Sequence, residues 1–142
     1  MAEIRPESWR LELVTFLGGT PIGTQGIRSD EFAETRTVET GSWLGREFQR
    51  RGYGTEQRIA ALALAFEGLG ARAAVSGALE GNVASARVSE KLGYAITGVG
   101  SVTPRGTPVP HTDFRLEREA WKALEHSAVE ILGLERCLPL LI

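Results

Sequence analysis

The first third of the chain alternates apolar and polar residues with the two-residue period of β-strands. Residues 9–44 are predicted to form three strands, at Arg10–Leu17, Ile22–Arg28 and Thr35–Leu44. The turn-forming residues Gly18–Pro21 join the first two strands as an antiparallel hairpin. Because Ser29–Glu34 is polar, that segment is predicted to be a loop.

From Thr55 the apolar period lengthens to that of a helix. One face of this predicted helix carries Ile59, Leu62, Ala63, Phe66 and Leu69, and the glycines at 68 and 70 end it. A strand at Ala73–Ala78 follows, then a second helix capped by Asn82 and ending at Gly93, then a strand at Tyr94–Val99. Residues 55–99 therefore predict a crossover of the βαβ type.

Residues 111–142 predict a strand, a helix and an apolar tail, after a proline-rich loop at Ser101–Pro110. The strand alternates, with Thr112, Phe114 and Leu116 on one side and His111, Asp113 and Arg115 on the other. A short helix at Glu119–His126 leads into the tail Ala128–Ile142, which is expected to pack on the domain or on a partner. The whole pattern predicts one mixed α/β domain over residues 1–142.

The charge balance is close to neutral, with 16 Lys and Arg against 18 Asp and Glu and a net charge of −2. No basic surplus is available for nucleic acid, and no apolar stretch approaches the roughly 20 residues of a membrane span. A single cysteine, Cys137, excludes an intrachain disulfide, and with two histidines it makes no usual zinc set. We therefore expect a cytoplasmic protein with no metal, membrane or nucleic-acid partner.

The segment Trp43–Thr55, WLGREFQRRGYGT, runs from the end of a predicted strand into the long helix. Within residues 45–55, Gly52 and Gly54 leave backbone N–H groups unobstructed at a helix N-terminus, which attracts anions. Arg50 and Arg51 add positive charge, so this loop predicts a diphosphate site. The alternative is a tight strand-to-helix turn that needs glycine. The spacing fits neither a dinucleotide fingerprint nor a P-loop.

The loop sequence Q-R-R-G-Y-G resembles the Q/R-x-x-G-x-G/A loop of the GNAT superfamily of acyl-CoA-dependent N-acyltransferases. The downstream signature N-x-x-S-x-x-V-x-x-K-L-G-F/Y is matched by Asn82, Ser85, Val88, Lys91, Leu92, Gly93 and Tyr94. The likeness covers about residues 10–125 and is greatest to the branch that contains the ribosomal-protein N-terminal acetyltransferases. It implies a GNAT-like, mostly antiparallel central sheet with a βαβ unit that binds acyl-CoA.

The resemblance implies acyl-CoA as cosubstrate, with acetyl as the usual acyl group. In the family the loop amides hold the CoA diphosphate, and the edge of the preceding strand pairs with pantetheine where it splays from the next strand. The CoA-binding residues implied here are Trp43, Leu44, Gln49, Arg50, Arg51, Gly52, Tyr53, Gly54, Thr55, Asn82 and Ser85. Arg87 and Lys91 either reach the adenosine phosphates or form a solvated helix face.

Direct attack of a neutral amine on a thioester needs a base for the amine proton and a donor for the leaving thiolate. Ser89 stands where many family members have a tyrosine, which implies that it donates to the CoA sulfur; the alternative is an exposed helix residue. Glu39, Asp113 and His111 are candidates for the base, or else occupy exposed strand faces. Cys137 lies in the tail and is a poor nucleophile candidate.

Family members usually begin with a strand and two helices ahead of the first hairpin, whereas the hairpin here begins near Trp9. The chain is therefore expected to be N-terminally truncated and to expose apolar sheet surface, which a second copy would cover in a homodimer. Two functions stay open: an N-acetyltransferase completed by dimerisation, or a non-catalytic CoA-binding or structural remnant. The acceptor also stays open between a ribosomal-protein N-terminus, a small amine and an antibiotic.

Overall fold

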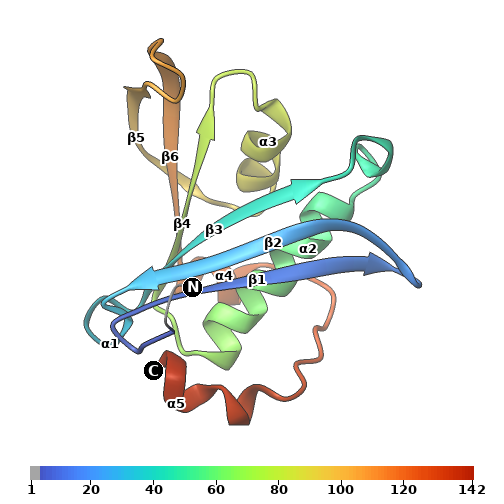
Figure 1. Cartoon of the computed structure of the whole chain (residues 1–142), viewed down its shortest axis with the longest axis vertical. Helices are drawn as coiled ribbons and strands as arrows, with labels where there is room; N and C mark the ends of the chain where they lie inside the picture. The colour runs from blue at the N-terminus through green and yellow to red at the C-terminus, as the bar shows by residue number, and fades with distance from the viewer. Residues whose placement is uncertain (1–3) are drawn as a thin grey trace.

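The computed structural model describes residues 4–142, which contain one six-stranded sheet (Figure 1). The strands are β1 Ser8–Leu17, β2 Thr20–Asp30, β3 Thr37–Leu44, β4 Ala73–Leu79, β5 Ala95–Val102 and β6 Val109–Glu117. They lie in the order β1-β2-β3-β4-β6-β5, and every neighbouring pair is antiparallel except β3 and β4. The predicted mixed α/β fold with a mostly antiparallel sheet is confirmed.

Five α-helices accompany the sheet in the described part of the chain. They are α1 Phe32–Thr35, α2 Tyr53–Ala63, α3 Val83–Lys91, α4 Arg118–Ala123 and α5 Leu138–Leu141. Short 3-10 turns occur at Arg46–Phe48 and Leu134–Arg136, and a π-helical turn at Leu64–Gly68 extends α2. The apolar stripe predicted for a single helix is buried at Leu62, Ala63, Phe66 and Leu69, across the junction between α2 and this turn.

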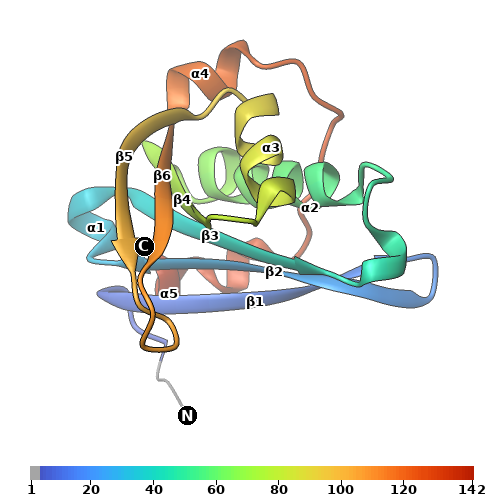
Figure 2. The ribbon, with the colours of Figure 1, turned by 90° about the horizontal axis from the view of Figure 1, so that it is seen from above.

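The helices α2, α3 and α4 lie on the same side of the sheet, and the core fills the space between (Figure 2). Its large members are Trp9, Ile27, Phe32, Val38, Leu62, Phe66, Phe114, Leu116, Trp121 and Leu141. Successive side chains along each strand point to opposite faces of the sheet. The face turned away from the helices therefore carries exposed polar side chains, among them Arg28, Glu39 and Asp113.

The prediction of a loop at Ser29–Glu34 is wrong. Strand β2 continues to Asp30, and α1 follows at once. The reason is Phe32, which is completely buried and whose ring centre lies 5.6 Å from that of Trp9. The polar residues around Phe32 in the sequence do not predict this contact. The loop predicted at Ser101–Pro110 is likewise shorter, because the β5–β6 pairing extends to Val102 opposite Val109.

The apolar tail packs mainly on its own domain. Leu141 is buried, and its carbonyl oxygen accepts a 2.9 Å hydrogen bond from Trp9 Nε1. Leu134 and Leu138 pack against the core, whereas Leu132 stays exposed. Within residues 4–142, no helix is long and apolar enough to cross a membrane.

Candidate acyl-CoA site

The parallel strands β3 and β4 separate soon after they begin. Three residue pairs join them, Thr37 with Ala73, Val38 with Ala74 and Glu39 with Val75. Beyond Glu39, β3 pairs with β2 and β4 with β6, so the two strands follow different neighbours. Figure 1 shows the two arrows diverging, with α3 beside the opening. In the described residues, the β4-facing backbone edge of 40–44 thus has no strand partner, as the predicted pantetheine edge requires.

The loop after β3 is held in place by its own polar groups. Gly45 N donates to Ile22 O at 2.8 Å, and Gln49 Nε2 donates to Leu44 O at 3.0 Å. The chain then turns through two left-handed residues, Arg50 with φ of 62° and Gly52 with φ of 87°. This geometry brings the chain directly into the first turn of α2.

The N-terminus of α2 is suited to an anion. Helix α2 begins at Tyr53, and its N-cap Gly52 supplies no side-chain hydrogen bond, so the first backbone amides are left for a ligand. Arg50 and Arg51 are exposed beside this turn. A Cβ on Gly54 would lie 3.9 Å from Val88 Cγ2, an ordinary contact distance, so α2 and α3 pack next to each other at this turn. Loop, helix end and strand opening therefore adjoin one another (Figure 2).

Asn82 caps α3, as predicted. Its Oδ1 accepts a 3.3 Å hydrogen bond from Ser85 N, and α3 begins at Val83. Asn82 is exposed and Ser85 is half-buried, at the end of α3 that follows β4. Asn82 also keeps an amide group that can donate to a ligand.

The alternative interpretation of Ser89 as an exposed helix residue is wrong, because its side chain is completely buried. Arg58 of α2, 1% exposed, donates from Nη1 to Ser89 Oγ at 3.5 Å. The Arg58 guanidinium also lies 5.8 Å from the ring centre of buried Tyr94. Within residues 4–142, Arg58 Nε and the Tyr94 hydroxyl have no hydrogen-bond partner.

Sequence reasoning missed Arg58, although a signal for it was present. Arg58 occupies the same helical face as Leu62 and Ala65, both of which are completely buried. A charged residue at such a position marks a buried polar site. Here it pairs with the residue expected to serve the leaving thiolate.

The candidate bases lie on the other face of the sheet. Glu39 is bound to Arg28, with Nη2 and Nε at 2.7 and 3.0 Å from Oε2. His111 Nδ1 lies 3.1 Å from Asp113 Oδ1 on β6. Ser89 lies on the helix side of the sheet. The candidate bases and Ser89, the expected hydrogen-bond donor to the thiolate, therefore lie on opposite sides of the opening between β3 and β4.

Trp43 and Leu44 end β3 at the mouth of the opening. Trp43 is 64% exposed, on the same face as Glu39, and Leu44 is half-buried. Cys137 lies in the tail, outside the loop and the opening. Among the described residues, no three His, Cys, Asp or Glu side chains gather as metal ligands.

A family model described as the acetyltransferase (GNAT) domain matches residues 2–95. The chain therefore belongs to the GNAT acetyltransferase family.

Solved acetyltransferases share the fold. An acetyltransferase from T. thermophilus is 24% identical, with a TM-score of 0.71 over 80% of this chain and 62% of that one. A GNAT-family acetyltransferase from Bacillus anthracis is 17% identical, with a TM-score of 0.68 over 78% and 66%. A mutant form of the spermidine/spermine N-acetyltransferase SpeG from Vibrio cholerae is 15% identical, with a TM-score of 0.71 over 80% and 70%. The chain spans 60–64% of the length of three such structures.

Proposed function

We propose that this domain transfers an acetyl group from acetyl-CoA to a primary amine by direct attack on the thioester. The observation that carries the proposal is the separation of β3 from β4 beside the uncapped N-terminus of α2. The opening leaves strand-edge backbone groups for the two pantetheine amides, and the helix end leaves N–H groups for the diphosphate. Family membership supports the same cosubstrate.

In this proposal the loop Gln49–Thr55 holds the diphosphate through its backbone amides, and Arg50 and Arg51 add charge at its rim. The edge Ser42–Leu44 pairs with pantetheine, as in β-augmentation, and Trp43 lies at the mouth of the opening. Asn82 and Ser85, at the start of α3, contact the same arm.

The reaction forms an N–C bond and breaks the C–S bond. The attacking amine loses its proton to Glu39 or Asp113, or to either through His111 or water, on the exposed face of the sheet. Ser89 Oγ donates a hydrogen bond to the CoA sulfur on the helix side, which stabilises the departing thiolate, while the proton lost by the amine stays on the base. Because Arg58 donates to Ser89 Oγ, the serine hydroxyl hydrogen is left for a different acceptor, which is the leaving sulfur.

Since Ser89 is completely buried, its contact with the sulfur requires α3 to shift when CoA enters. Glu39 can accept the proton at Oε1, because both contacts from Arg28 go to Oε2. The shift of α3 is expected on cosubstrate binding. A domain that binds CoA without transferring acetyl would stop at this step.

Two measurements on the purified chain test the function. Calorimetric titration with CoA measures binding, and release of free CoA thiol from acetyl-CoA measures transfer. The acceptor panel contains peptides with free N-termini, polyamines and an aminoglycoside, because the acceptor is not determined by the loop or the opening. Binding together with amine-dependent thiol release supports the proposal. Binding without release identifies the non-catalytic remnant, and absence of binding overturns both functions.

We also propose that the domain forms a homodimer through the edge strand β5. Ile96 is 62% exposed and Val99 is 79% exposed on this strand, whose outer edge has no strand partner among the described residues. A two-fold pairing of β5 with its copy would cover both side chains and extend the sheet. The cytoplasmic location expected from the sequence stays a prediction.

A further inference from the structure

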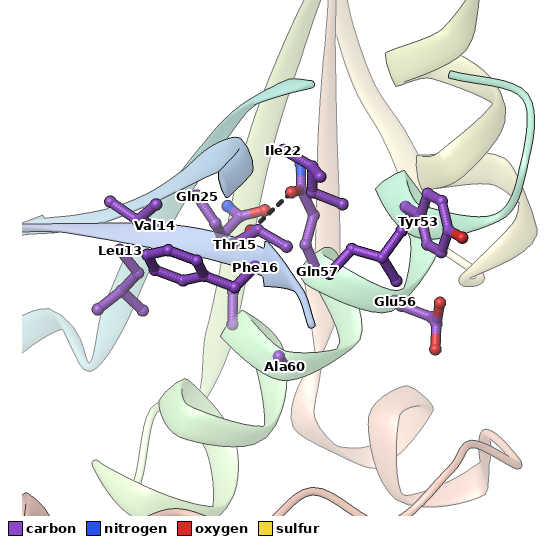
Figure 3. A pocket seen from close by; sticks show the side chains of 12 residues that line it. Leu13, Val14, Thr15, Phe16, Ile22, Gln25, Tyr53, Glu56, Gln57 and Ala60 are labelled. Carbon is purple, nitrogen blue, oxygen red and sulfur yellow. Dashed lines mark hydrogen bonds between the residues drawn. The ribbon is translucent and has the colours of Figure 1, made fainter. Parts of the chain in front are cut away.

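A cavity of about 390 Å³ lies between the hairpin β1–β2 and the first two turns of α2 (Figure 3). Helix α2 divides it from the opening between β3 and β4, and Tyr53 at the start of α2 is the lining residue that it shares with the proposed CoA loop. On this helix Gln57 faces the cavity, and the next residue, Arg58, faces Ser89. The candidate bases lie on the opposite face of the sheet. Nothing in the proposed reaction therefore uses this cavity.

The floor of the cavity is polar and neutral. Gln25 is only 2% exposed, and its Nε2 donates to two backbone carbonyls, Gly26 O and Gly41 O, each at 3.0 Å. Both amide hydrogens are thereby used, which fixes the direction of the side chain. Gln25 Oε1 remains buried and has no hydrogen-bond partner among the described residues.

A second amide lies next to it. Gln57 Oε1 accepts a 2.9 Å hydrogen bond from Thr15 Oγ1, which orients the Gln57 amide. Gln57 Nε2 has no hydrogen-bond partner within residues 4–142, so it is a free donor. Figure 3 shows Thr15, Gln25 and Gln57 pointing toward one another from β1, β2 and α2. The floor thus holds one unpaired acceptor, which neighbouring atoms shield, beside one free donor, so a ligand reaches the acceptor through a small movement of the lining side chains.

The walls of the cavity are apolar. Leu13 and Phe16 come from β1, Ile22 from β2 and Ala60 from α2. The lining includes no cationic side chain, and its one carboxylate is that of exposed Glu56. An anion would find no counter-charge here, and an ammonium group would meet only neutral groups at the floor.

We propose that this cavity binds a neutral aliphatic amide. The ligand N–H donates to Gln25 Oε1, its carbonyl accepts from Gln57 Nε2, and its branched aliphatic part packs against Leu13, Phe16 and Ile22. A buried amide acceptor left without a donor is costly, so a ligand that supplies both halves of the pair is favoured over one that supplies only the aliphatic part. A free small amide and a peptide segment with a leucine-like side chain share this chemistry.

The test uses isovaleramide as probe and follows the backbone and side-chain amide signals of the folded chain by nuclear magnetic resonance. We expect saturable shifts at the Gln25 and Gln57 side-chain amides. The matched probe 4-methyl-2-pentanone keeps the aliphatic part and the carbonyl but has no N–H, and it should bind at least about fivefold more weakly. A peptide arm, the capped sequence Gly-Leu-Gly, distinguishes the sources: tighter binding than isovaleramide identifies a peptide, and no binding identifies a free amide.

Ala60→Phe fills the cavity without removing a hydrogen bond and should weaken isovaleramide binding at least about tenfold. Ala120→Phe, at an exposed alanine of α4 away from the cavity, is the matched control and should leave binding unchanged. Gln25→Met removes the acceptor and should also weaken isovaleramide binding, but it loses the two hydrogen bonds from Gln25 Nε2 to the backbone as well. If Gln25→Met does not fold, Ala60→Phe alone tests the proposal. Absence of saturable shifts, equal binding of the ketone, or unchanged binding in Ala60→Phe would each overturn the proposal.

Discussion

Arg58 and Ser89 meet in the contact between α2 and α3, where the guanidinium Nη1 donates to the serine Oγ at 3.5 Å. Both side chains are completely buried or nearly so, and among the described residues no carboxylate pairs with the arginine. A buried cation without a counter-ion carries a desolvation penalty of several kcal/mol, on the order of that for a buried ion pair with one partner removed. Because Arg58 is hydrogen-bonded to Ser89, we expect this costly burial to serve the positioning of Ser89 in the proposed reaction.

Replacing Arg58 by methionine should separate catalysis from stability. Because the buried charge has no counter-ion, Arg58→Met should leave the thermal midpoint unchanged or raise it. The loss of the hydrogen bond to Ser89 should lower kcat by about tenfold with little effect on the KM for acetyl-CoA. Arg58→Lys keeps a charge and a donor and should restore part of kcat. Equal kcat in wild type and Arg58→Met would contradict the role of Arg58 in positioning Ser89.

Ser89→Ala should lower kcat while calorimetric affinity for CoA stays nearly unchanged, since the hydroxyl is proposed to act only on the leaving sulfur. If Arg58 acts through Ser89, the double variant should be no slower than Ser89→Ala alone. Steady-state rates of thiol release measure both effects. Additive losses in the double variant would mean that the two residues act separately.

Gly52→Asp should abolish measurable CoA binding, because it places a carboxylate at the N-terminus of α2 where the diphosphate is proposed to bind. Gly52 also has a φ of 87°, so some loss of stability, about 1 kcal/mol, is expected from backbone strain alone. Gly106→Asp is the control, because Gly106 has a φ of 77° in an exposed loop. It should carry a similar strain and bind CoA normally. Retained CoA affinity in folded Gly52→Asp would disprove the diphosphate site.

Val99→Asp tests the proposed dimer. A charge at the centre of the exposed β5 edge should prevent pairing between two copies and give a monomer of about 15 kDa by light scattering. Val14→Asp, at an exposed position of the opposite edge strand β1, should leave the dimer intact. A wild-type chain that is monomeric at micromolar concentration would show that β5 is not an interface.

Trp9→Phe tests how the tail is attached. The change keeps an aromatic ring in the core but removes the hydrogen bond from Trp9 Nε1 to Leu141 O. Denaturant unfolding should show a loss of about 1–3 kcal/mol, because the buried carbonyl loses its partner and the site loses volume. Trp43→Phe, at an exposed tryptophan, should unfold at the wild-type midpoint. Equal stability of the two variants would mean that the tail contact contributes nothing.

Local patterns were sufficient for most elements of this domain. The strand and helix periods, the Asn82 cap and the left-handed Gly52 before α2 are properties of short segments, since each depends on residues within a few positions of one another. The same holds for the loop, because the glycine spacing that frees the first amides of α2 is readable without the rest of the chain.

Tertiary contacts decided the rest. Phe32 forms a helix inside a polar segment because Trp9 packs on it, and β3 leaves β4 because each strand follows a different partner. Ser89 is buried because Arg58, 31 positions earlier, lies against it across two helices. The free acceptor of Gln25 exists only where β1, β2 and α2 enclose it. None of these relationships is local, because each depends on how segments far apart in the chain pack together.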